Sequence, residues 1–423
     1  MPNQIKPDPT KPEILILGGG FGGVRAALRL ARKLPSSKIT VVDKRKYHGY
    51  YPDLYELAAA VFPKKNNLGK KDFLKLKSTV ALPFKYIFSG FPNIKFVEGT
   101  VLDIDFEAGK VFLENNEALS YNFLILALGS ETNFFNIPHL GEKAHELKNT
   151  TDALNIRSAF EEILDTRGKN TIISVIIAGG GFTGCELAGE LARSLNAFAR
   201  IYNHPRENFS ITMIEGSSVL LGPTDPWIQK KAKERLEDLG AIIKLNSFIV
   251  DVKGDKIVLK DGSEIRFDLL IWTAGVRPNQ LLENIKVKLE KNGCVGTDKN
   301  LRALPFKNVF AIGDMCFSKN PETGKPLPMT AQVAMLEADY IGKYISKMVS
   351  GKNYKDFEPT VGRFIIPLGG KYALADLGIM KISGFLPWFL KRIVALKYFA
   401  SIMPFGRAFK IWKRGLGIFI AND

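Results

Sequence analysis

Hydrophobic positions near the start of the chain are concentrated in two short, mainly apolar runs, at residues 13–17 and 38–42. Between these runs, apolar side chains recur at helical spacing as far as Leu34. Short apolar runs bounded by glycine or polar residues are typical of buried strands, and a helix between two such strands is the usual crossover of a parallel sheet. The pattern therefore predicts a strand–helix–strand unit.

The same order of elements returns about 160 residues later. Apolar runs at residues 175–178 and 210–214 flank a helical pattern that continues to Ala199. A polar insert at residues 202–208 lengthens the connection, which loops tolerate at small entropic cost. Two copies of one unit predict an α/β fold with two Rossmann-like, three-layer nucleotide-binding domains.

Each copy is followed by a second repeated pattern. Residues 109–129 and 254–275 both read as a hairpin and then an apolar strand that ends at a small residue and glycine. The predicted turns are Asn115-Asn116 and Asp261-Gly262, residue types that favour tight hairpins. The duplication therefore extends beyond the strand–helix–strand unit.

The junction between strand and helix in the first copy carries the sequence GGGFGG at residues 18–23. In a dinucleotide fingerprint, the first glycine (Gly18) permits a tight turn and the second (Gly20) lets the backbone approach a pyrophosphate. The third (Gly23) lets the helix pack on the strand. Asp43 ends the next strand 20 residues later and is predicted to accept a hydrogen bond from a ribose hydroxyl.

The second copy repeats this fingerprint with Gly179, Gly181 and Gly184, and its second strand ends in Glu215. A carboxylate at this position bonds the 2'-hydroxyl of an adenosine ribose and repels a 2'-phosphate. Residues 216–218 offer no arginine that could bind such a phosphate. The chain is therefore predicted to bind two dinucleotides, of which the second is NADH rather than NADPH.

A further strand, at residues 308–312, runs into Gly313-Asp314. An aspartate accepts hydroxyl protons well, and the glycine before it lets backbone N–H groups face a phosphate. With the two glycine turns, this segment resembles the two-dinucleotide flavoprotein reductases. The resemblance implies that the first copy binds FAD, that Gly313-Asp314 contacts its ribityl chain and pyrophosphate, and that the middle copy binds a nicotinamide nucleotide.

Four segments, YHGYYPDLYELAA (47–59), GGGFTGCELAGEL (179–191), WTAGVRPN (272–279) and TAQVAMLEA (330–338), resemble in their order the type II NADH dehydrogenases, which are non-pumping NADH:quinone oxidoreductases. The resemblance implies that Glu186 lies beside nicotinamide and flavin, in the first helical turn after Gly184. It also implies that Ala331-Gln332 begin the quinone motif AQxAxQ. Leu336 replaces the second glutamine of that motif, so Gln332 is left as its one amide for a quinone carbonyl.

The candidate site residues follow from the fingerprints and the resemblance. For FAD they are Gly18, Gly20, Phe21, Gly23, Asp43, Lys44, Gly129, Gly313, Asp314, Ala331 and Gln332. For NADH they are Gly179, Gly181, Phe182, Gly184, Glu186, Glu215 and Gly275. Glu186 and Gln332 are the predicted catalytic residues, Gln332 and Leu336 the predicted quinone contacts, and Pro52, Leu54 and Tyr55 the predicted wall of the flavin site.

Three widely spaced cysteines predict neither a disulfide framework nor a metal site. Cys185, at the start of the second fingerprint helix, reads as a buried packing residue rather than a reactive thiol. His48 likewise reads as a packed loop histidine rather than a proton carrier. A sulfide:quinone oxidoreductase, which needs a pair of cysteines near the flavin, is the nearest alternative function, and a regulatory NADH-binding flavoprotein is the other.

The chain has a net charge of +16, which calls for an anionic partner. Residues 377–422 contain eight Lys and Arg and no acid. Two helices are expected here, and the predicted membrane contacts are Trp388, Phe405, Phe409, Trp412, Leu416 and Phe419. Aromatic residues on one stripe, with Arg407, Lys410 and Arg414 opposite, favour peripheral binding to anionic lipid over nucleic acid. The alternative is a helix pair folded onto the protein's own core.

These patterns predict a domain order in which the second nucleotide-binding domain is inserted into the first. Residues 1–150 and 297–350 form the predicted FAD domain, 151–296 the NADH domain, and 351–423 a C-terminal membrane-binding helical region. The predicted function is electron transfer from NADH through FAD to a quinone, at the cytoplasmic face of the cell membrane. The sequence leaves the quinone type and the oligomeric state, including a homodimer, open.

Overall fold

The computed structural model describes residues 11–61, 76–320, 324–360 and 362–422. The chain divides into two compact units, each made of three separate stretches of sequence. Unit 1 comprises residues 1–48, 82–131 and 276–361, and unit 2 comprises residues 49–81, 132–275 and 362–423. These borders differ from those of the predicted domains, because residues 49–81 and the C-terminal segment group with the second copy.

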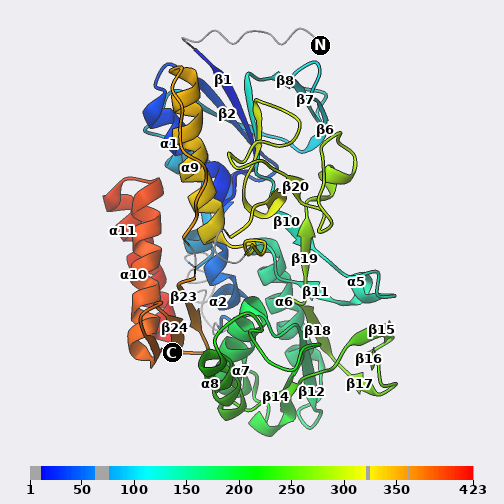
Figure 1. Cartoon of the computed structure of the whole chain (residues 1–423). Helices are drawn as coiled ribbons and strands as arrows, with labels where there is room; N and C mark the ends of the chain where they lie inside the picture. Colours follow the sequence, from blue (N-terminus) through cyan, green and yellow to red (C-terminus); the bar gives the residue numbers. More distant parts are fainter. Residues whose placement is uncertain (1–10, 62–75, 321–323, 361, 423) are drawn as a thin grey trace. The chain divides into compact units, whose positions relative to one another are not determined.

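Unit 1 is built on a parallel sheet in the strand order β21-β9-β1-β2-β5, of which β1 and β2 are labelled in Figure 1. Its strands are β1 (Glu13–Leu17), β2 (Lys38–Asp43), β5 (Ile94–Glu98), β9 (Phe123–Leu126) and β21 (Val309–Ala311). Helix α1 (Phe21–Lys33) connects β1 to β2 and lies beside α9 (Ala331–Val349). Two arginines of α1, Arg25 and Arg29, join the helices by ion pairs to Asp339.

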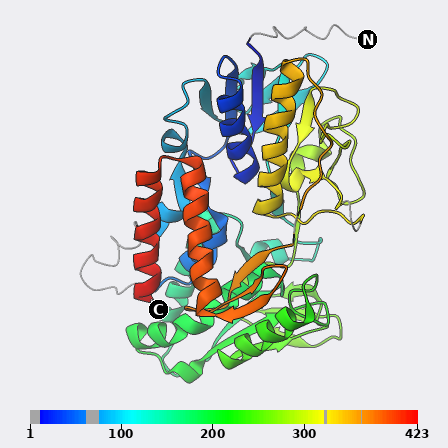
Figure 2. The ribbon, with the colours of Figure 1, turned by 60° about the vertical axis from the view of Figure 1, so that its left-hand side comes forward.

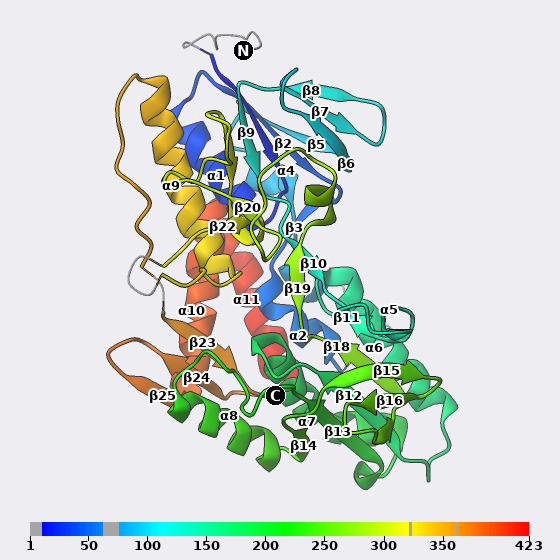
Figure 3. The same cartoon turned by 45° about the vertical axis from the view of Figure 1, so that its right-hand side comes forward.

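Unit 2 repeats this plan with the strand order β11-β18-β12-β13-β14 (Figure 3). Its strands are β11 (His145–Glu146), β12 (Ile173–Ala178), β13 (Phe209–Ile214), β14 (Ala241–Lys244) and β18 (Leu269–Trp272). The helices of this part are α2 (Leu54–Ala58), α5 (Leu140–Lys143), α6 (Thr150–Thr166), α7 (Phe182–Tyr202) and α8 (Pro226–Asp238). The strands and helices predicted for both copies are confirmed, with ends that shift by up to three residues.

The predicted hairpins are confirmed as two three-stranded antiparallel sheets. Unit 1 contains β6 (Val101–Asp105), β7 (Lys110–Leu113) and β8 (Ala118–Ser120), and unit 2 contains β15 (Ile249–Lys253), β16 (Lys256–Leu259) and β17 (Glu264–Arg266). Both sheets carry a register shift in the first strand, between Val101 and Asp103 and between Ile249 and Asp251. The agreement of even this irregularity shows that the whole pattern is duplicated.

The C-terminal segment of unit 2 forms a small sheet and two helices. The sheet contains β23 (Phe364–Pro367), β24 (Ala373–Asp376) and β25 (Lys381–Gly384), followed by α10 (Phe385–Ile402) and α11 (Phe405–Asn422). Helices α10 and α11 lie side by side (Figure 2), and α10 also packs on the sheet. No helix in the described parts of the chain is both long and apolar enough to cross a membrane.

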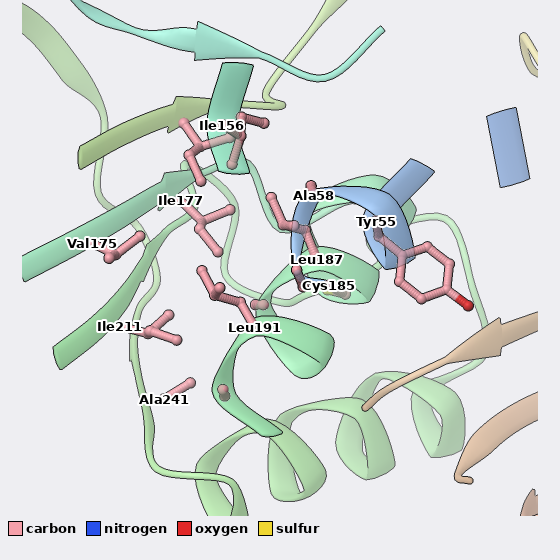
Figure 4. Packing of buried hydrophobic residues seen from close by; sticks show 14 of the residues in the cluster. Tyr55, Ala58, Ile156, Val175, Ile177, Cys185, Leu187, Leu191, Ile211 and Ala241 are labelled. Carbon is pink, nitrogen blue, oxygen red and sulfur yellow. The ribbon is translucent and has the colours of Figure 1, made fainter. Parts of the chain in front are cut away.

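The largest hydrophobic core lies in unit 2, between its parallel sheet and the helices α6 and α7. Figure 4 shows Ile156, Val175, Ile177, Leu187 and Leu191 meeting there from both layers. Cys185 lies among these side chains, which confirms the prediction of a buried packing residue. The core holds α7 against the sheet and so fixes the glycine turn that precedes this helix.

Candidate active site

The two glycine turns have nearly identical geometry. Gly18 and Gly179 both have φ +107°, where a side chain is strained, and an added Cβ on Gly18 would lie 2.2 Å from the carbonyl oxygen of Ala127. A Cβ on Gly23 or Gly184 would lie 1.8 or 1.9 Å from the carbonyl oxygen of the first glycine of its own turn. The packing of the protein itself therefore requires glycine at the first and third positions.

The middle glycine of each turn has a different reason to be small. No described atom lies within 4 Å of a Cβ built on Gly20 or on Gly181, so protein packing does not exclude a side chain there. Both residues are helix N-caps, of α1 and α7, and they bring no side chain to the first N–H groups of their helices. Open space at the N-terminus of a helix is what a phosphate group needs. The turns therefore fit two dinucleotides.

The acid at the end of the second strand contacts the turn in the same way in both units. Asp43 Oδ2 accepts the Gly19 N–H at 2.8 Å, and Glu215 Oε2 accepts the Gly180 N–H at 2.6 Å. Each carboxylate accepts two further hydrogen bonds from one nearby residue. Asp43 accepts both from Arg45, and Glu215 accepts both from Ser217. A carboxylate has about four acceptor positions, so one remains for a ribose hydroxyl.

His48 supports the first turn from behind. Its imidazole is fully buried, its Nδ1 lies 2.9 Å from the carbonyl oxygen of Gly19, and its ring meets Phe21 edge-on. Burial lowers the pKa of His48 to about 4, so the ring is neutral at physiological pH. This geometry supports the packed-histidine interpretation. Lys44 is exposed, and its contact with FAD stays a prediction.

The Gly313–Asp314 turn follows β21 in unit 1. Gly313 has φ +66°, and Asp314 Oδ2 accepts a hydrogen bond from the Ser130 hydroxyl. The Gly313 N–H is bonded by Glu337 of α9 at 2.5 Å. Glu337 is a functional candidate that the sequence analysis did not identify. Glu337 lies one residue beyond the quinone motif. Its position on the buried face of α9, where an acid is unusual, is the one signal that could have identified it.

The predicted quinone contacts lie in the first two turns of α9. The cap of this helix is Thr330, whose hydroxyl accepts the Val333 N–H at 3.3 Å, so Gln332 does not serve as the cap. The Gln332 side chain is exposed and that of Leu336 is half-buried. The amide is therefore available to a ligand, and its quinone contact stays a prediction.

Glu186 is the fifth residue of α7, so it lies beyond the first helical turn in which it was predicted. Its charge is balanced by Lys391 of α10, whose Nζ lies 2.8 Å from Glu186 Oε1. Burial raises the pKa of Glu186, and the Lys391 ammonium opposes this effect. Glu186 is therefore an ion-paired carboxylate, and its place beside nicotinamide and flavin stays a prediction.

A second buried ion cluster joins α10 to residues 53–56. The Arg392 guanidinium is 2% exposed and lies 2.6 Å from Glu56 and 3.5 Å from Asp53. The indole N–H of Trp412 donates to the Arg392 carbonyl oxygen, which ties α11 to the same place. Leu54 and Tyr55, predicted to wall the flavin site, belong to the core of unit 2, and Pro52 is half-buried.

These contacts correct the predicted lipid-facing residues of the tail. Trp388 is 2% exposed and stacks on the Arg392 guanidinium, so its ring does not face outward. Lys391 and Arg392 form ion pairs with Glu186 and Glu56 rather than with lipid headgroups. Trp412 and Leu416 are half-buried, and the Phe419 side chain lies outside the described residues. The tail is thus partly folded onto the protein's own core, which was the alternative interpretation.

The tail nevertheless exposes a large apolar surface. We call "tail surface" the exposed large apolar residues Ile379, Met380, Phe385, Leu386, Phe389, Ile393, Val394, Phe405 and Phe409. Phe385 stacks on Phe389 and Phe405 on Phe409, each pair at helical spacing. Contiguous exposed apolar patches mark protein or membrane contacts.

All three cysteines are free thiols. Burial raises the pKa of Cys185 and Cys316 well above the usual range, and that of Cys294 to about 11. The thiols are therefore protonated and poor nucleophiles at neutral pH. Within the described residues, no group of three or more His, Cys, Asp or Glu could hold a metal ion.

Comparisons with known proteins agree with this geometry. The family model for the pyridine nucleotide-disulphide oxidoreductases matches residues 12–338. The chain is 26% identical over 417 residues to a type II NADH:quinone oxidoreductase of Staphylococcus aureus strain MSSA476, covering 95% of this chain and 98% of that one.

Two solved structures show the same fold. The structure of NDH2 from Plasmodium falciparum in complex with NADH matches with a TM-score of 0.81 at 20% identity, over 96% of this chain and 97% of that one. The sulfide:quinone oxidoreductase of Aquifex aeolicus matches with a TM-score of 0.76 at 18% identity, over 96% and 92%.

Proposed function

The chain belongs to the pyridine nucleotide-disulphide oxidoreductase family, and from this premise we propose that it is a type II NADH:quinone oxidoreductase. It binds a flavin and NADH, and the flavin is FAD. When bound, the flavin accepts a hydride from NADH and gives two electrons to a quinone. The observation that carries the proposal is the pair of matching glycine turns, each with open space at its middle glycine, in a chain similar to such enzymes along 95% of its length.

The residues of unit 1 hold the FAD in this proposal. Gly20 and the first N–H groups of α1 receive the pyrophosphate, and Asp43 bonds the ribose of the adenosine. Asp314, oriented by Ser130, accepts hydroxyl protons of the ribityl chain. Each contact uses a group that the protein already holds in place, so little ordering is needed on binding.

The residues of unit 2 hold NADH. Gly181 and the start of α7 receive its pyrophosphate, and Glu215 bonds the 2'-hydroxyl of the adenosine ribose. Glu186, with its charge balanced by Lys391, lies at the nicotinamide end. Gln332 of α9 donates a hydrogen bond from its exposed amide to a quinone carbonyl, and Leu336 supplies an apolar contact where the family motif has a second amide.

The carboxylate of Glu215 is expected to set the preference for NADH. Glu215→Gln removes the charge that repels a 2'-phosphate, so the ratio of kcat/KM for NADH to that for NADPH should fall about tenfold, which corresponds to about 1.4 kcal/mol. Steady-state rates with both nucleotides measure this ratio. Glu207→Gln, an exposed acid of the same unit, is the matched control and should leave the ratio unchanged. An unchanged ratio in Glu215→Gln would contradict the assigned contact.

The state of the thiols argues against sulfide oxidation as the activity. That chemistry needs a pair of reactive cysteines near the flavin, whereas Cys185 lies in the core of unit 2. Cys294 and Cys316 belong to unit 1, but burial raises the pKa of both. The match to a sulfide:quinone oxidoreductase is thus a likeness of fold.

Anaerobic stopped-flow absorbance tests the proposed function directly. NADH should bleach the flavin of the purified protein, and menaquinone or ubiquinone should restore the colour, with a rate that accounts for steady-state turnover. A protein that binds NADH but is not reoxidised by any quinone would be a regulatory flavoprotein instead. Sulfide in place of NADH should leave the flavin oxidised.

We further propose that the tail surface binds the cytoplasmic face of the cell membrane, where NADH comes from water and quinone from lipid. The tail surface offers exposed aromatic and branched apolar side chains on α10 and α11. The exposed cations Lys397, Arg407, Lys410 and Lys413 accompany it and favour anionic lipid. Helix α10 packs on β23, β24 and β25 and is joined to Glu186 and Glu56 by ion pairs, so the tail surface is held by the fold of unit 2.

Charged substitutions in the tail surface should release the protein from membranes. Leu386→Asp combined with Val394→Asp, at side chains 57% and 54% exposed, should weaken binding to phosphatidylglycerol vesicles at least about tenfold, because each side chain contributes on the order of 1.5 kcal/mol when buried. Vesicle co-sedimentation measures the binding. Ile172→Asp, a 63% exposed position of unit 2 outside the tail surface, is the control. Full vesicle binding by the double variant would refute the membrane assignment, and NADH reduction of ferricyanide should persist in all three proteins.

A further inference from the structure

Glu337 is a fully buried carboxyl group directly behind the Gly313–Asp314 turn. Its side chain is 0% exposed, and its two oxygens accept the Gly313 N–H at 2.5 Å and the Ser318 hydroxyl at 2.6 Å. Both donors are neutral. A carboxylate buried among neutral donors is only partly compensated, so its protonated and ionised forms lie close in free energy.

Asp339, two residues further along α9, shows the contrasting case. Its carboxylate is paired with Arg25 and Arg29 of α1. Although burial acts to raise the pKa of Asp339, these two guanidinium groups lower it. The two arginines of α1 therefore pair with Asp339 rather than with Glu337, and Asp339 stays ionised throughout the neutral pH range.

The other titratable groups around Glu337 do not compete with it for a proton. Asp314, on the turn itself, acts through its negative charge to raise the pKa of Glu337. Cys316 and Cys294 face it from neighbouring segments, and burial keeps both thiols protonated. Burial, opposed by the hydrogen bonds from Ser318 and Gly313, raises the pKa of Glu337 to about 8. Among the described titratable groups beside this turn, Glu337 is thus the one whose charge changes near pH 8.

We propose that Glu337 takes up the proton that accompanies reduction of the flavin held by the Gly313–Asp314 turn. The inference rests on the proposed function, because that function places the flavin at this turn. A hydride brings two electrons and one proton, whereas a quinol carries two electrons and two protons. Above about pH 8, where Glu337 is ionised in the oxidised protein, the second proton comes from water and forms an O–H bond on Glu337 while the flavin is reduced. This proton leaves when a quinone reoxidises the flavin. Added negative charge on the flavin favours the protonated carboxyl, and the Gly313 amide links the two groups.

The midpoint potential of the bound flavin, measured against pH, tests the proposal. Each proton taken up per two electrons changes the potential by about 30 mV per pH unit. As the pH rises above about 8 and Glu337 becomes ionised in the oxidised protein, the slope of the parent should therefore become steeper than that of Glu337→Gln, by up to that amount. Glutamine preserves both contacts, because its carbonyl accepts from Gly313 and its amide donates to Ser318. The reduced-minus-oxidised infrared spectrum of the parent should gain a protonated-carboxyl band that the variant lacks.

Equal slopes for the parent and Glu337→Gln, with no carboxyl band, would overturn the proposal. Asp339→Asn is the matched control on the same helix, since it removes a carboxylate that stays ionised and should shift the potential without changing the slope. The titration uses dithionite as reductant, so it does not depend on NADH. If NADH fails to bleach the flavin of the parent, the proposed function fails. If NADH bleaches it and the slopes agree, only the role of Glu337 fails.

Discussion

Replacing Gly181 with valine should abolish the reduction of the flavin by NADH while leaving the protein folded. Its Cβ would meet no described atom within 4 Å, so the side chain fits the protein but occupies the space assigned to the NADH pyrophosphate. We expect kcat/KM for NADH to fall at least about 100-fold, which corresponds to about 2.7 kcal/mol. Stopped-flow bleaching of the flavin by NADH measures this loss, and the flavin content of the purified protein should not change.

Two matched valine substitutions show whether the effect belongs to the site. Gly20→Val makes the same change in unit 1, so it should produce a folded protein that lacks flavin. Gly222→Val, in unit 2 outside the glycine turn, also has open space around the new Cβ and should behave like the parent. Normal NADH kinetics in Gly181→Val would show that the pyrophosphate does not bind at this turn.

Replacing Arg392 with methionine should destabilise unit 2 by about 3–5 kcal/mol, because it leaves Asp53 and Glu56 buried without their cation. For a unit of this size, the melting temperature should fall on the order of 10 °C. Thermal unfolding followed by circular dichroism measures the change. Lys397→Met, at an exposed position of the same helix, should alter stability by less than about 0.5 kcal/mol.

The pH dependence of this loss has a definite sign. Burial first, and then the nearby Glu190, raise the pKa of Glu56 to about 8, whereas Arg392 lowers it. Without Arg392 the pKa of folded Glu56 rises further, so the folded variant holds its proton to higher pH than the folded parent does. As the pH rises above about 8, the free energy of unfolding of the variant therefore falls more steeply than that of the parent, and the difference between the two proteins grows. A loss that is constant or shrinks between pH 8 and 9 would contradict the ion-pair explanation.

Local patterns identified the duplicated domains well. Continuous apolar runs identified β1 and β12, and the glycine spacing identified the turns, because both signals lie within a few adjacent residues. Helix α6 also carries a local signal at its start. Asn149 and Asp152 form a reciprocal capping box at its start, a pattern that marks a helix N-terminus in sequence alone.

The ion pairs of the tail could not be found in this way. Lys391 bonds Glu186 across 205 positions of sequence, and Arg392 bonds Glu56 across 336. A lysine and an arginine between apolar residues on a helix favour an exposed, lipid-facing side, and only the folded chain shows the acids that oppose them. The same contacts explain why Trp388 is buried, since its ring covers the Arg392 guanidinium.

The likeness of the two glycine turns means that another part of each unit must select its ligand. Since both turns share their dihedral angles and their acid–amide bond, neither can by itself distinguish a flavin from a nicotinamide. The two sheets do differ in the edge strand that lies next to β9 in unit 1 and next to β18 in unit 2. In unit 1 it is β21, which leads into Gly313-Asp314, whereas unit 2 places the short β11 at the equivalent edge. We therefore expect the segment that follows this edge strand, rather than the glycine turn, to decide which unit binds the flavin and which binds the nicotinamide nucleotide.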